Sequence, residues 1–167
     1  MSTETHRAAA PASIRCAVLV ISDTRILDTD TGGRAIAELL TAHGHVLVER
    51  RLLKDDPAPV ASVVRQWAAS GEVDAILTTG GTGITRRDST FEAIDGLLEK
   101  RLPGFGELFR MLSFEQVGAA AMLSRACAGT CGRAIVIALP GSEKAVRLAM
   151  TRLILPELGH LVAELRR

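Results

Sequence analysis

The chain has 167 residues, of which 47% are hydrophobic and 23% charged, and these values are typical of one globular domain. Its formal net charge of +1 argues against nucleic acid or an anionic membrane as the main partner. No run approaches the ~20 apolar residues of a membrane span, and residues 1–13 lack the apolar core of a signal peptide. We therefore expect a cytoplasmic protein, with a flexible tail over residues 1–13 and a single domain over residues 14–167.

Apolar periodicity divides the chain into alternating strands and helices. In chain order the pattern predicts a strand over 15–22, a helix over 34–44, a strand over 45–53, a helix with an apolar stripe over 60–67, a strand over 74–79, helices over 90–100 and 104–118, a strand over 133–139, and helical segments from 143 and after 156. The strand segments are continuous apolar runs, as expected of strands that are buried on both faces. Alternation of this kind predicts an α/β fold with three layers, α/β/α, around a mostly parallel central sheet.

The segment GFGELFRMLSFEQVG, residues 104–118, has apolar residues on nearly every side of its predicted helix. A helix of this kind needs partners on every side. Because a chain of this size offers little additional core, we expect the second partner to be another copy of the chain.

Polar loops follow the predicted strands, at the edge where parallel α/β sheets bind their ligands. The segments at this edge are Ser22-Asp23-Thr24, Lys54-Asp55-Asp56, Thr78-Thr79-Gly80-Gly81-Thr82-Gly83 and Pro140-Gly141-Ser142. All four are acidic, hydroxylic or rich in glycine, so the pattern predicts one binding site. In the loop after the first strand, Asp28 and Asp30 are expected to order the chain and Thr31 to cap the following helix.

The glycines of LTTGGTGITRRDST, residues 77–90, would bring bare backbone N–H groups close to a ligand and allow the positive φ angles of an anion-binding nest. The helices predicted after Ser89 and Ser142 would add partial positive charge. A tight strand-to-helix turn is the alternative explanation of the glycines. The segment contains no GK[ST] and no complete G-x-G-x-x-G, so neither a P-loop nor a dinucleotide-binding turn is predicted.

The acids at this edge have two possible roles. Asp88 could cap the helix that begins near Ser89, and Asp55 or Asp56 could cap the helix that begins at Pro57. Alternatively, they could hold a cation, because carboxylates near a polyphosphate repel it unless a cation lies between them. Mg²⁺ commonly uses one or two carboxylates together with substrate phosphate. The pattern therefore indicates a magnesium–nucleotide site.

The segments VLVISDT, DTDTGG, LTTGGTGITRRDSTFEAI, GFGELFRMLS, AMLSRACAG and ALPGSEKAV occur in this order over residues 14–158. With them the chain resembles the MogA/MoaB family of molybdenum cofactor biosynthesis proteins. The 104–118 segment is more similar to the MoaB branch, and AMLSR to relatives that are active adenylyltransferases. The resemblance implies a molybdopterin-binding fold and a trimeric or hexameric assembly. It also implies molybdopterin and ATP as substrates, and other cofactor biosynthesis proteins as partners.

Active members of the family transfer AMP from Mg-ATP to the terminal phosphate of molybdopterin and release pyrophosphate. Carried over by position, the resemblance implies that Asp88 and Asp55 are catalytic and hold Mg²⁺. In this chain Lys54 replaces the family's proline, which leaves Asp55 and Asp56 as alternatives. The remaining matches bind substrate or nucleotide: Thr79, Gly80, Gly81, Thr82 and Gly83 in the nucleotide and phosphate loop, Ser124 and Arg125 on the pterin side, and Pro140, Gly141 and Ser142 at a second phosphate turn. Ser22 and Asp23, at the end of the first strand, are also expected to bind substrate or nucleotide.

Two further functions stay open at this point. A MoaB-type oligomer could bind molybdopterin as a scaffold without turning it over. The chain also resembles, in its GGTG block, a domain of the competence/damage-inducible proteins that act on nucleotide pyrophosphates. Those proteins usually carry a further domain, for which 167 residues leave no room.

Overall fold

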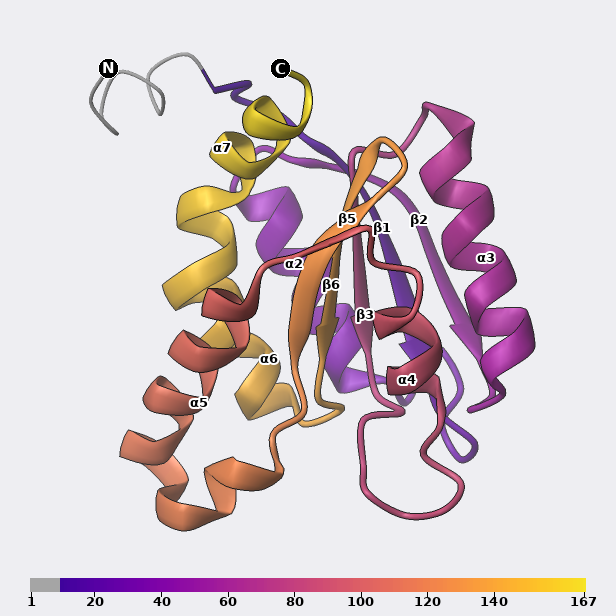
Figure 1. The fold of residues 1–167 in the computed structure, drawn as a ribbon, viewed down its shortest axis with the longest axis vertical. Helices are drawn as coiled ribbons and strands as arrows, with labels where there is room; N and C mark the ends of the chain where they lie inside the picture. Colours follow the sequence, from indigo (N-terminus) through magenta and orange to yellow (C-terminus); the bar gives the residue numbers. More distant parts are fainter. Residues whose placement is uncertain (1–9) are drawn as a thin grey trace.

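The computed structural model describes residues 10–167, and residues 1–9 of the expected tail lie outside that range. The described chain forms a six-stranded sheet with the order β2-β1-β3-β6-β5-β4 (Figure 1). The strands β1 (Arg15–Ile21), β2 (Val46–Leu53), β3 (Ala75–Thr79) and β6 (Ala134–Leu139) are parallel to one another. Both pairings of β5 are antiparallel. The predicted α/β fold with a mostly parallel sheet is therefore confirmed.

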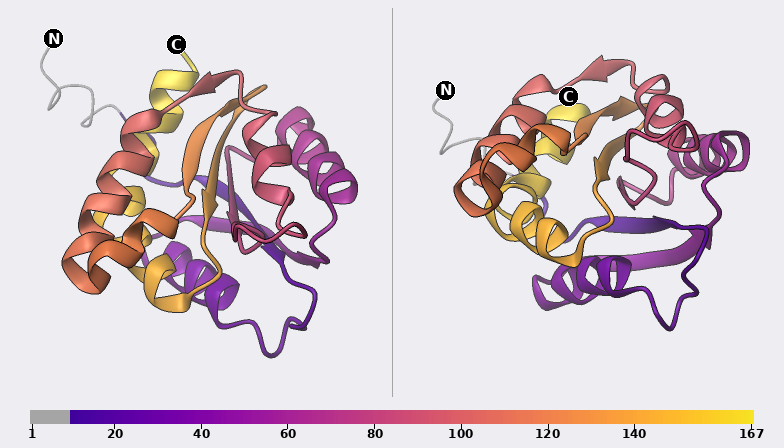
Figure 2. Two further views of the ribbon diagram at one scale, coloured as in Figure 1. Left: turned by 60° about the horizontal axis from the view of Figure 1, so that its bottom comes forward. Right: turned by 90° about the horizontal axis from the view of Figure 1, so that it is seen from below.

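Helices cover both faces of the sheet and complete the three layers (Figures 1 and 2). One face carries α2 (Thr31–Ala42), α5 (Pro103–Val117), α6 (Glu143–Ala149) and α7 (Leu155–Leu165), with the π-helical turn η2 (Met150–Ile154) between α6 and α7. The other face carries α3 (Pro57–Ser70) and α4 (Thr90–Asp95). Alternate strand residues enter the two cores, so Val18 packs with the first group of helices and Leu19 with the second. This double burial is the reason why the strands read as continuous apolar runs.

The sequence patterns missed two strands at one edge of the sheet, β4 (Lys100–Arg101) and β5 (Cys127–Cys131). Strand β5 has the sequence CAGTC, without the bulky aliphatic side chains that mark the other strands, and β4 is short and exposed. A Cβ on Gly129 would lie 2.4 Å from the carbonyl oxygen of Lys100, so the pairing depends on that glycine. The helix predicted over residues 90–100 ends at Asp95 because the chain then enters β4.

Aspartates begin the two helices that follow β1 and β2. Asp30 caps α2 by accepting a hydrogen bond from the Gly33 amide (3.0 Å), and Thr31 is the first helical residue, so the prediction of Thr31 as the cap was wrong. The buried Asp30 carboxylate also accepts a 2.8 Å bond from Arg50 Nη2, which ties the loop after β1 to strand β2. Asp56 caps α3 through the Ala58 amide (3.2 Å).

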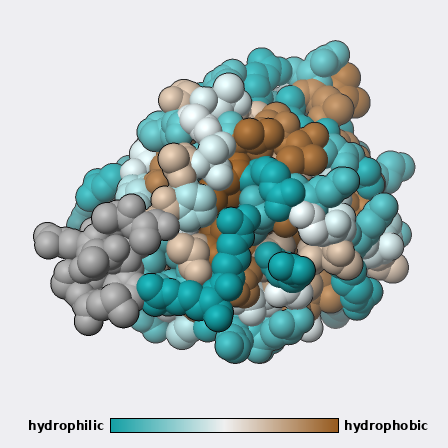
Figure 3. Space-filling model, turned by 90° about the horizontal axis from the view of Figure 1, so that it is seen from above, coloured by the Kyte–Doolittle hydropathy of each residue, from teal (hydrophilic) through white to brown (hydrophobic). Residues whose placement is uncertain are grey.

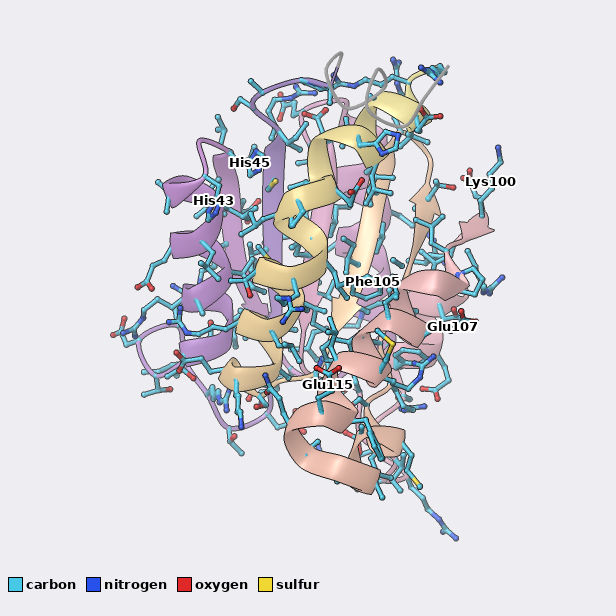
Figure 4. The ribbon with its side chains drawn as sticks, turned by 90° about the vertical axis from the view of Figure 1, so that its left-hand side faces the viewer. His43, His45, Lys100, Phe105, Glu107 and Glu115 are labelled. Atoms are coloured by element: carbon cyan, nitrogen blue, oxygen red, sulfur yellow. The ribbon has the colours of Figure 1, made fainter. Side chains whose placement is uncertain are left out.

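Helix α5 buries Phe109 and Leu112 against the sheet side. Its outer side and the following 3₁₀ segment η1 (Gly118–Leu123) expose Leu108, Met111, Phe114, Val117, Met122 and Leu123. A groove of about 650 Å³, lined mainly by apolar residues of α5, η2 and α7, runs between the helices, and Phe105 lies in it (Figure 4). The described helix is therefore apolar on two sides, as its sequence indicated.

The first described residues and the C-terminus lie at the opposite end of the sheet from the loops that follow β1, β3 and β6 (Figure 1). At the terminal end, hydrophilic side chains surround patches of hydrophobic ones (Figure 3). The first described residues run past α7, where a Cβ on Gly159 would lie 2.9 Å from the carbonyl oxygen of Pro11. Within residues 10–167, no helix is both long and apolar enough to cross a membrane.

Candidate functional site

The carboxyl ends of β1, β2, β3 and β6 lie at one edge of the sheet, because these four strands are parallel and in register. Ile21 pairs with Leu53, Val20 with Thr79, and Thr79 with Leu139. The four polar segments that the sequence analysis identified lie at or directly after these strand ends. The structure therefore brings residues 22–24, 54–56, 78–83 and 140–142 to the same edge.

Glycine is required where the loop after β3 crosses the end of β1. Gly80 has φ +96° and Gly81 has φ +65°. A Cβ on Gly80 would lie 2.1 Å from the carbonyl oxygen of Ile21, and a Cβ on Gly81 would lie 3.3 Å from Asp55 Oδ1. The turn explanation and the ligand explanation are thus compatible, because both glycines make the turn and Gly81 also leaves its backbone uncovered next to a carboxylate.

The structure separates the roles of the adjacent acids Asp55 and Asp56. Asp56 caps α3. Asp55 instead points toward the loop between β3 and α4, residues 80–89, which we call the glycine loop, and its Oδ1 accepts a hydrogen bond from the Thr90 hydroxyl at the end of that loop. The Asp55 amide donates to Asp23 Oδ1 at 3.2 Å. Asp55 is therefore the acid of this pair that faces the other site segments.

Asp88 is not a helix cap. Ser89 occupies the capping position of α4 without a side-chain bond, and Asp88 instead accepts hydrogen bonds from the Thr85 hydroxyl and the Thr85 amide (2.8 Å). The hydrogen bond from the Thr85 hydroxyl is the main cause of a lowered pKa at Asp88, and the nearby Arg125 guanidinium adds to it. Asp88 is therefore ionised at neutral pH. A Cβ on Gly83 would lie 2.6 Å from Asp88 Oδ2, so the third glycine makes room for this carboxylate.

Arg125 donates hydrogen bonds to three carbonyl oxygens of the glycine loop. Its Nε donates to the carbonyl oxygen of Thr82 (2.9 Å), and its Nη2 donates to the carbonyl oxygens of Gly83 and, at 3.3 Å, of Asp88. Nη1 pairs with Glu92, and the guanidinium lies 4.7 Å from the centre of the Phe91 ring. The resemblance placed Arg125 on the pterin side, but in the structure its donors are used on the loop itself.

Asp23 joins three loops. Its Oδ1 accepts from the Asp55 amide, and its Oδ2 accepts a 2.8 Å bond from Arg87 Nη2 at the far end of the glycine loop. Because Arg87 is largely exposed, this ion pair adds little stability. The ion pair instead holds the loop after β3 next to the loop after β1.

A cleft of about 420 Å³ opens at this edge between the ends of β1, β3 and β6. Its lining residues are Val20, Ile21, Ser22, Thr24, Arg25, Thr79, Gly80, Gly141 and Ser142. The Thr79 hydroxyl donates to the carbonyl oxygen of Pro140 (2.9 Å) and so connects two sides of the cleft. Asp55 lies beyond its edge, next to Gly81, and Asp88 lies farther along the loop, next to Gly83.

The sequence analysis missed Arg25 as a lining residue of the cleft, whereas Thr24, which also lines it, belongs to a segment that the analysis placed at this edge. The available signal was a cation only four residues after the last residue of β1, within the polar segment SDTR. Ser124, which the analysis did include, does not line the cleft; its amide bonds to the carbonyl oxygen of Ala121 (3.0 Å).

Comparison with known proteins places the chain among cofactor biosynthesis proteins. The family described as "Probable molybdopterin binding domain" matches residues 17–160. Molybdenum cofactor biosynthesis protein B of Bacillus cereus is 50% identical over 168 aligned positions, which cover 100% of this chain and 99% of the relative. A crystal structure of a molybdenum cofactor biosynthesis protein B has 50% identity and a TM-score of 0.91, covering 95% of this chain and 99% of that one.

The tungsten cofactor synthesizing protein MoaB from Pyrococcus furiosus is 37% identical, with a TM-score of 0.83 over 95% of this chain and 100% of that one. These likenesses cover nearly the whole domain, not only the glycine loop, and the MoaB names agree with the branch that residues 104–118 indicated. The chain therefore belongs to the molybdopterin-binding domain family of molybdenum cofactor biosynthesis proteins.

Proposed function

We propose that this protein acts in molybdenum cofactor biosynthesis as a molybdopterin adenylyltransferase. In the proposed reaction an oxygen of the terminal phosphate of molybdopterin attacks the α-phosphorus of ATP. The new P–O bond joins AMP to molybdopterin, and the bond between the α-phosphorus and its bridging oxygen breaks, so pyrophosphate leaves. The family match and the names of the relatives support the pathway.

The single observation that supports transfer chemistry is the arrangement of Asp55 and Asp88 along one bare glycine loop. Gly81 leaves space beside Asp55, and Gly83 leaves space beside Asp88. Phosphoryl and nucleotidyl transfer needs alignment and neutralised charge more than a protein nucleophile. A loop with uncovered amides next to two carboxylates fits that requirement, provided that a cation accompanies the nucleotide.

In this proposal Asp55 and Asp88 hold a magnesium ion. Hydrogen bonds from Thr90 and Thr85 engage Asp55 Oδ1 and Asp88 Oδ2, whereas the other oxygen of each carboxylate has no side-chain donor within residues 10–167. The described residues contain no group of three or more potential ligands, so the remaining coordination positions would go to substrate phosphate and water, as Mg²⁺ prefers. When bound, the ion would neutralise charge on the phosphates.

The other residues in this proposal position the substrates. The amides of Gly81 and Gly141 bind anionic oxygens, whereas the Gly80 amide donates to the carbonyl oxygen of Leu139 (3.1 Å). Thr79 keeps the two phosphate-side turns together through Pro140. Arg125 and Asp23 set the shape of the loop that carries Asp88. None of these side chains forms a bond to the substrate in the reaction, because the phosphate of molybdopterin itself is the nucleophile.

We also propose that the protein is a homo-oligomer, a trimer or a hexamer, and that the exposed apolar side of α5 and η1 forms a subunit interface. Its apolar residues lie side by side on adjacent turns, from Leu108 to Leu123. Light scattering coupled to gel filtration should give the mass of three or six chains for the unmodified protein. Phe114→Glu should give smaller species, and an unmodified protein that runs as a monomer would contradict the assembly.

The adenylyltransferase proposal is tested by incubating the protein with molybdopterin, ATP and Mg²⁺ and measuring pyrophosphate. We expect release with the unmodified protein and a loss of about 100-fold or more for Asp88→Asn, which keeps the size of the side chain. Glu72→Gln, an exposed change outside the site, should behave like the unmodified protein. Binding of molybdopterin without pyrophosphate release would identify a scaffold instead, and full activity of Asp88→Asn would reject the assigned role of this acid.

A further inference from the structure

One cation faces the cleft at the edge of the sheet. Of the described residues that line it, Arg25 alone is charged, and the others are apolar, hydroxylic or glycine. Arg25 is half-buried and lies in the loop directly after β1. The cleft therefore has positive charge on one wall, and two residues without side chains, Gly80 and Gly141, on the others.

Local hydrogen bonds fix the Arg25 side chain at this place. The Ser22 Oγ accepts from the amides of Thr24 (3.3 Å) and Arg25 (3.1 Å), so the backbone turns sharply after β1. At the other end of the side chain, Nη1 donates to the carbonyl oxygen of Gly141 at 3.2 Å. The guanidinium thus spans the cleft from the loop after β1 to the turn after β6.

Arg25 differs in its partners from the other arginines that are bonded at this edge. Arg125 donates to carbonyl oxygens of the glycine loop and is paired with Glu92, and Arg87 is paired with Asp23. Within residues 10–167 Arg25 has no carboxylate partner, and its single side-chain bond goes to a neutral carbonyl. Since a guanidinium carries five N–H donors, most of them remain for an anion in the cleft.

We propose that Arg25 is the residue that binds the phosphoryl group of the substrate in this cleft and selects for a phosphorylated ligand. The planar fork of a guanidinium matches two oxygens of one phosphate, and Gly141, on the adjoining wall, has a backbone amide without a hydrogen bond to residues 10–167. The Ser22 hydroxyl accepts two amide bonds and keeps its own hydrogen for the same anion. This inference deepens the proposed function and rests on it for the identity of the ligand.

Calorimetry on the full chain tests the proposal with two probes, inorganic pyrophosphate for a nucleotide polyphosphate and inorganic phosphate for a phosphate monoester. The unmodified protein should bind at least one probe. Arg25→Gln should weaken that binding about 10- to 100-fold, the expected value of a charged hydrogen bond, although glutamine can still donate to Gly141. Arg25→Lys should give an intermediate affinity because it keeps the charge but not the fork.

The matched control is Arg65→Gln, an exposed arginine on α3 outside the cleft, which should leave both affinities unchanged. A tighter complex with pyrophosphate would assign Arg25 to the nucleotide, and a tighter complex with phosphate would assign it to the pterin phosphate. Arg25→Gln with unchanged affinity for both probes would overturn the inference, as would an unmodified protein that binds neither.

Failure of the proposed function is distinguishable from failure of this inference. Arg25-dependent binding of the anions in a protein that releases no pyrophosphate from ATP would reject catalysis and keep the anion site. Normal pyrophosphate release by Arg25→Gln, with unchanged anion affinity, would keep catalysis and reject the role of Arg25.

Discussion

The two ends of the sheet use the same residue types in opposite ways. At the end near the termini, the buried Asp74 carboxylate accepts bonds from the Arg15 amide (3.1 Å), Arg15 Nε (3.0 Å), Arg15 Nη2 (2.6 Å) and Arg166 Nη2 (2.7 Å). Burial alone would raise the pKa of Asp74, but together these bonds outweigh it and lower the pKa to about 2. Both oxygens of this acid are occupied by the protein.

At the other end, Asp55 and Asp88 are held by threonine hydroxyls instead of arginines, and each keeps one oxygen without a side-chain donor in the described chain. Arg25, at that end, bonds through its side chain to the carbonyl oxygen of Gly141 and has no carboxylate partner within residues 10–167. The difference teaches how a structural acid is distinguished from a binding acid. The first has both oxygens bonded by arginines, and the second, in the proposed function, keeps one oxygen for the cation that accompanies the ligand.

The sharpest test of this comparison uses the neighbouring acids Asp55 and Asp56. We expect Asp55→Ala to lower pyrophosphate release by about 100-fold or more, because it removes a carboxylate that faces the glycine loop. Asp56→Ala should keep activity within about twofold and lower the free energy of unfolding by about 1 kcal/mol, the usual loss for a helix cap. Kinetic assays and urea unfolding of both variants measure these effects, and the reverse pattern would show that the two roles are exchanged.

Two glycines with positive φ allow a second test. A Cβ on Gly80 (φ +96°) would collide with the carbonyl oxygen of Ile21, whereas a Cβ on Gly71 (φ +73°) at the opposite end would meet nothing within 4 Å. Gly80→Ala should therefore lower the free energy of unfolding by more than about 2 kcal/mol. Gly71→Ala should lower the free energy of unfolding by only about 1 kcal/mol, because the alanine adds backbone strain at a positive φ but no collision. Equal losses in urea unfolding would contradict the close approach of the glycine loop to β1.

Asp74→Asn tests the structural acid. The change should lower the free energy of unfolding by about 1–2 kcal/mol at neutral pH, since both arginines are partly exposed and screened by solvent, and should leave pyrophosphate release unchanged. The folded-state pKa of about 2 is below the reference value of 3.8. Asp74 therefore stabilises the fold above about pH 4, and this contribution disappears as the pH falls toward 2. Unfolding curves across that range should show a smaller acid dependence for Asp74→Asn; an unchanged dependence would assign the effect to other acids.

The smallest expected effect concerns His45, at the start of β2 (Figure 4). Its Nδ1 accepts a 3.3 Å bond from the Ile14 amide, and partial burial is the main cause of its lowered pKa. Because the folded pKa is below the unfolded one, the protein should lose less than about 1 kcal/mol of stability as the pH falls below about 6.5. His45→Gln should remove this loss in unfolding measurements from pH 7 to 5. A variant that retains the loss would point to another histidine.

Much of the architecture follows from local patterns. Continuous apolar runs such as CAVLVI predict strands buried on both faces, and amphipathic stripes predict the helices between them. Parallel connectivity then places Ser22, Asp55, Gly80 and Gly141 at one edge, whatever the details of the packing. Strand β5 was missed for the opposite reason. Its small side chains carry no periodic signal, and its place depends on pairing with β6, which is near in sequence, and with Lys100, which is not.

The sequence by itself determined the fold class, the order of the main elements and the edge that holds the site, because hydrophobic periodicity and chain connectivity are local properties. Only the tertiary structure decided that Asp56 caps a helix while Asp55 faces Thr90, that Arg125 is used by the glycine loop, and that Arg25 reaches Gly141. These assignments depend mainly on contacts between residues far apart in the chain. The sequence shows where an acid or an arginine occurs, but its neighbours in the folded structure determine whether its charge is already paired.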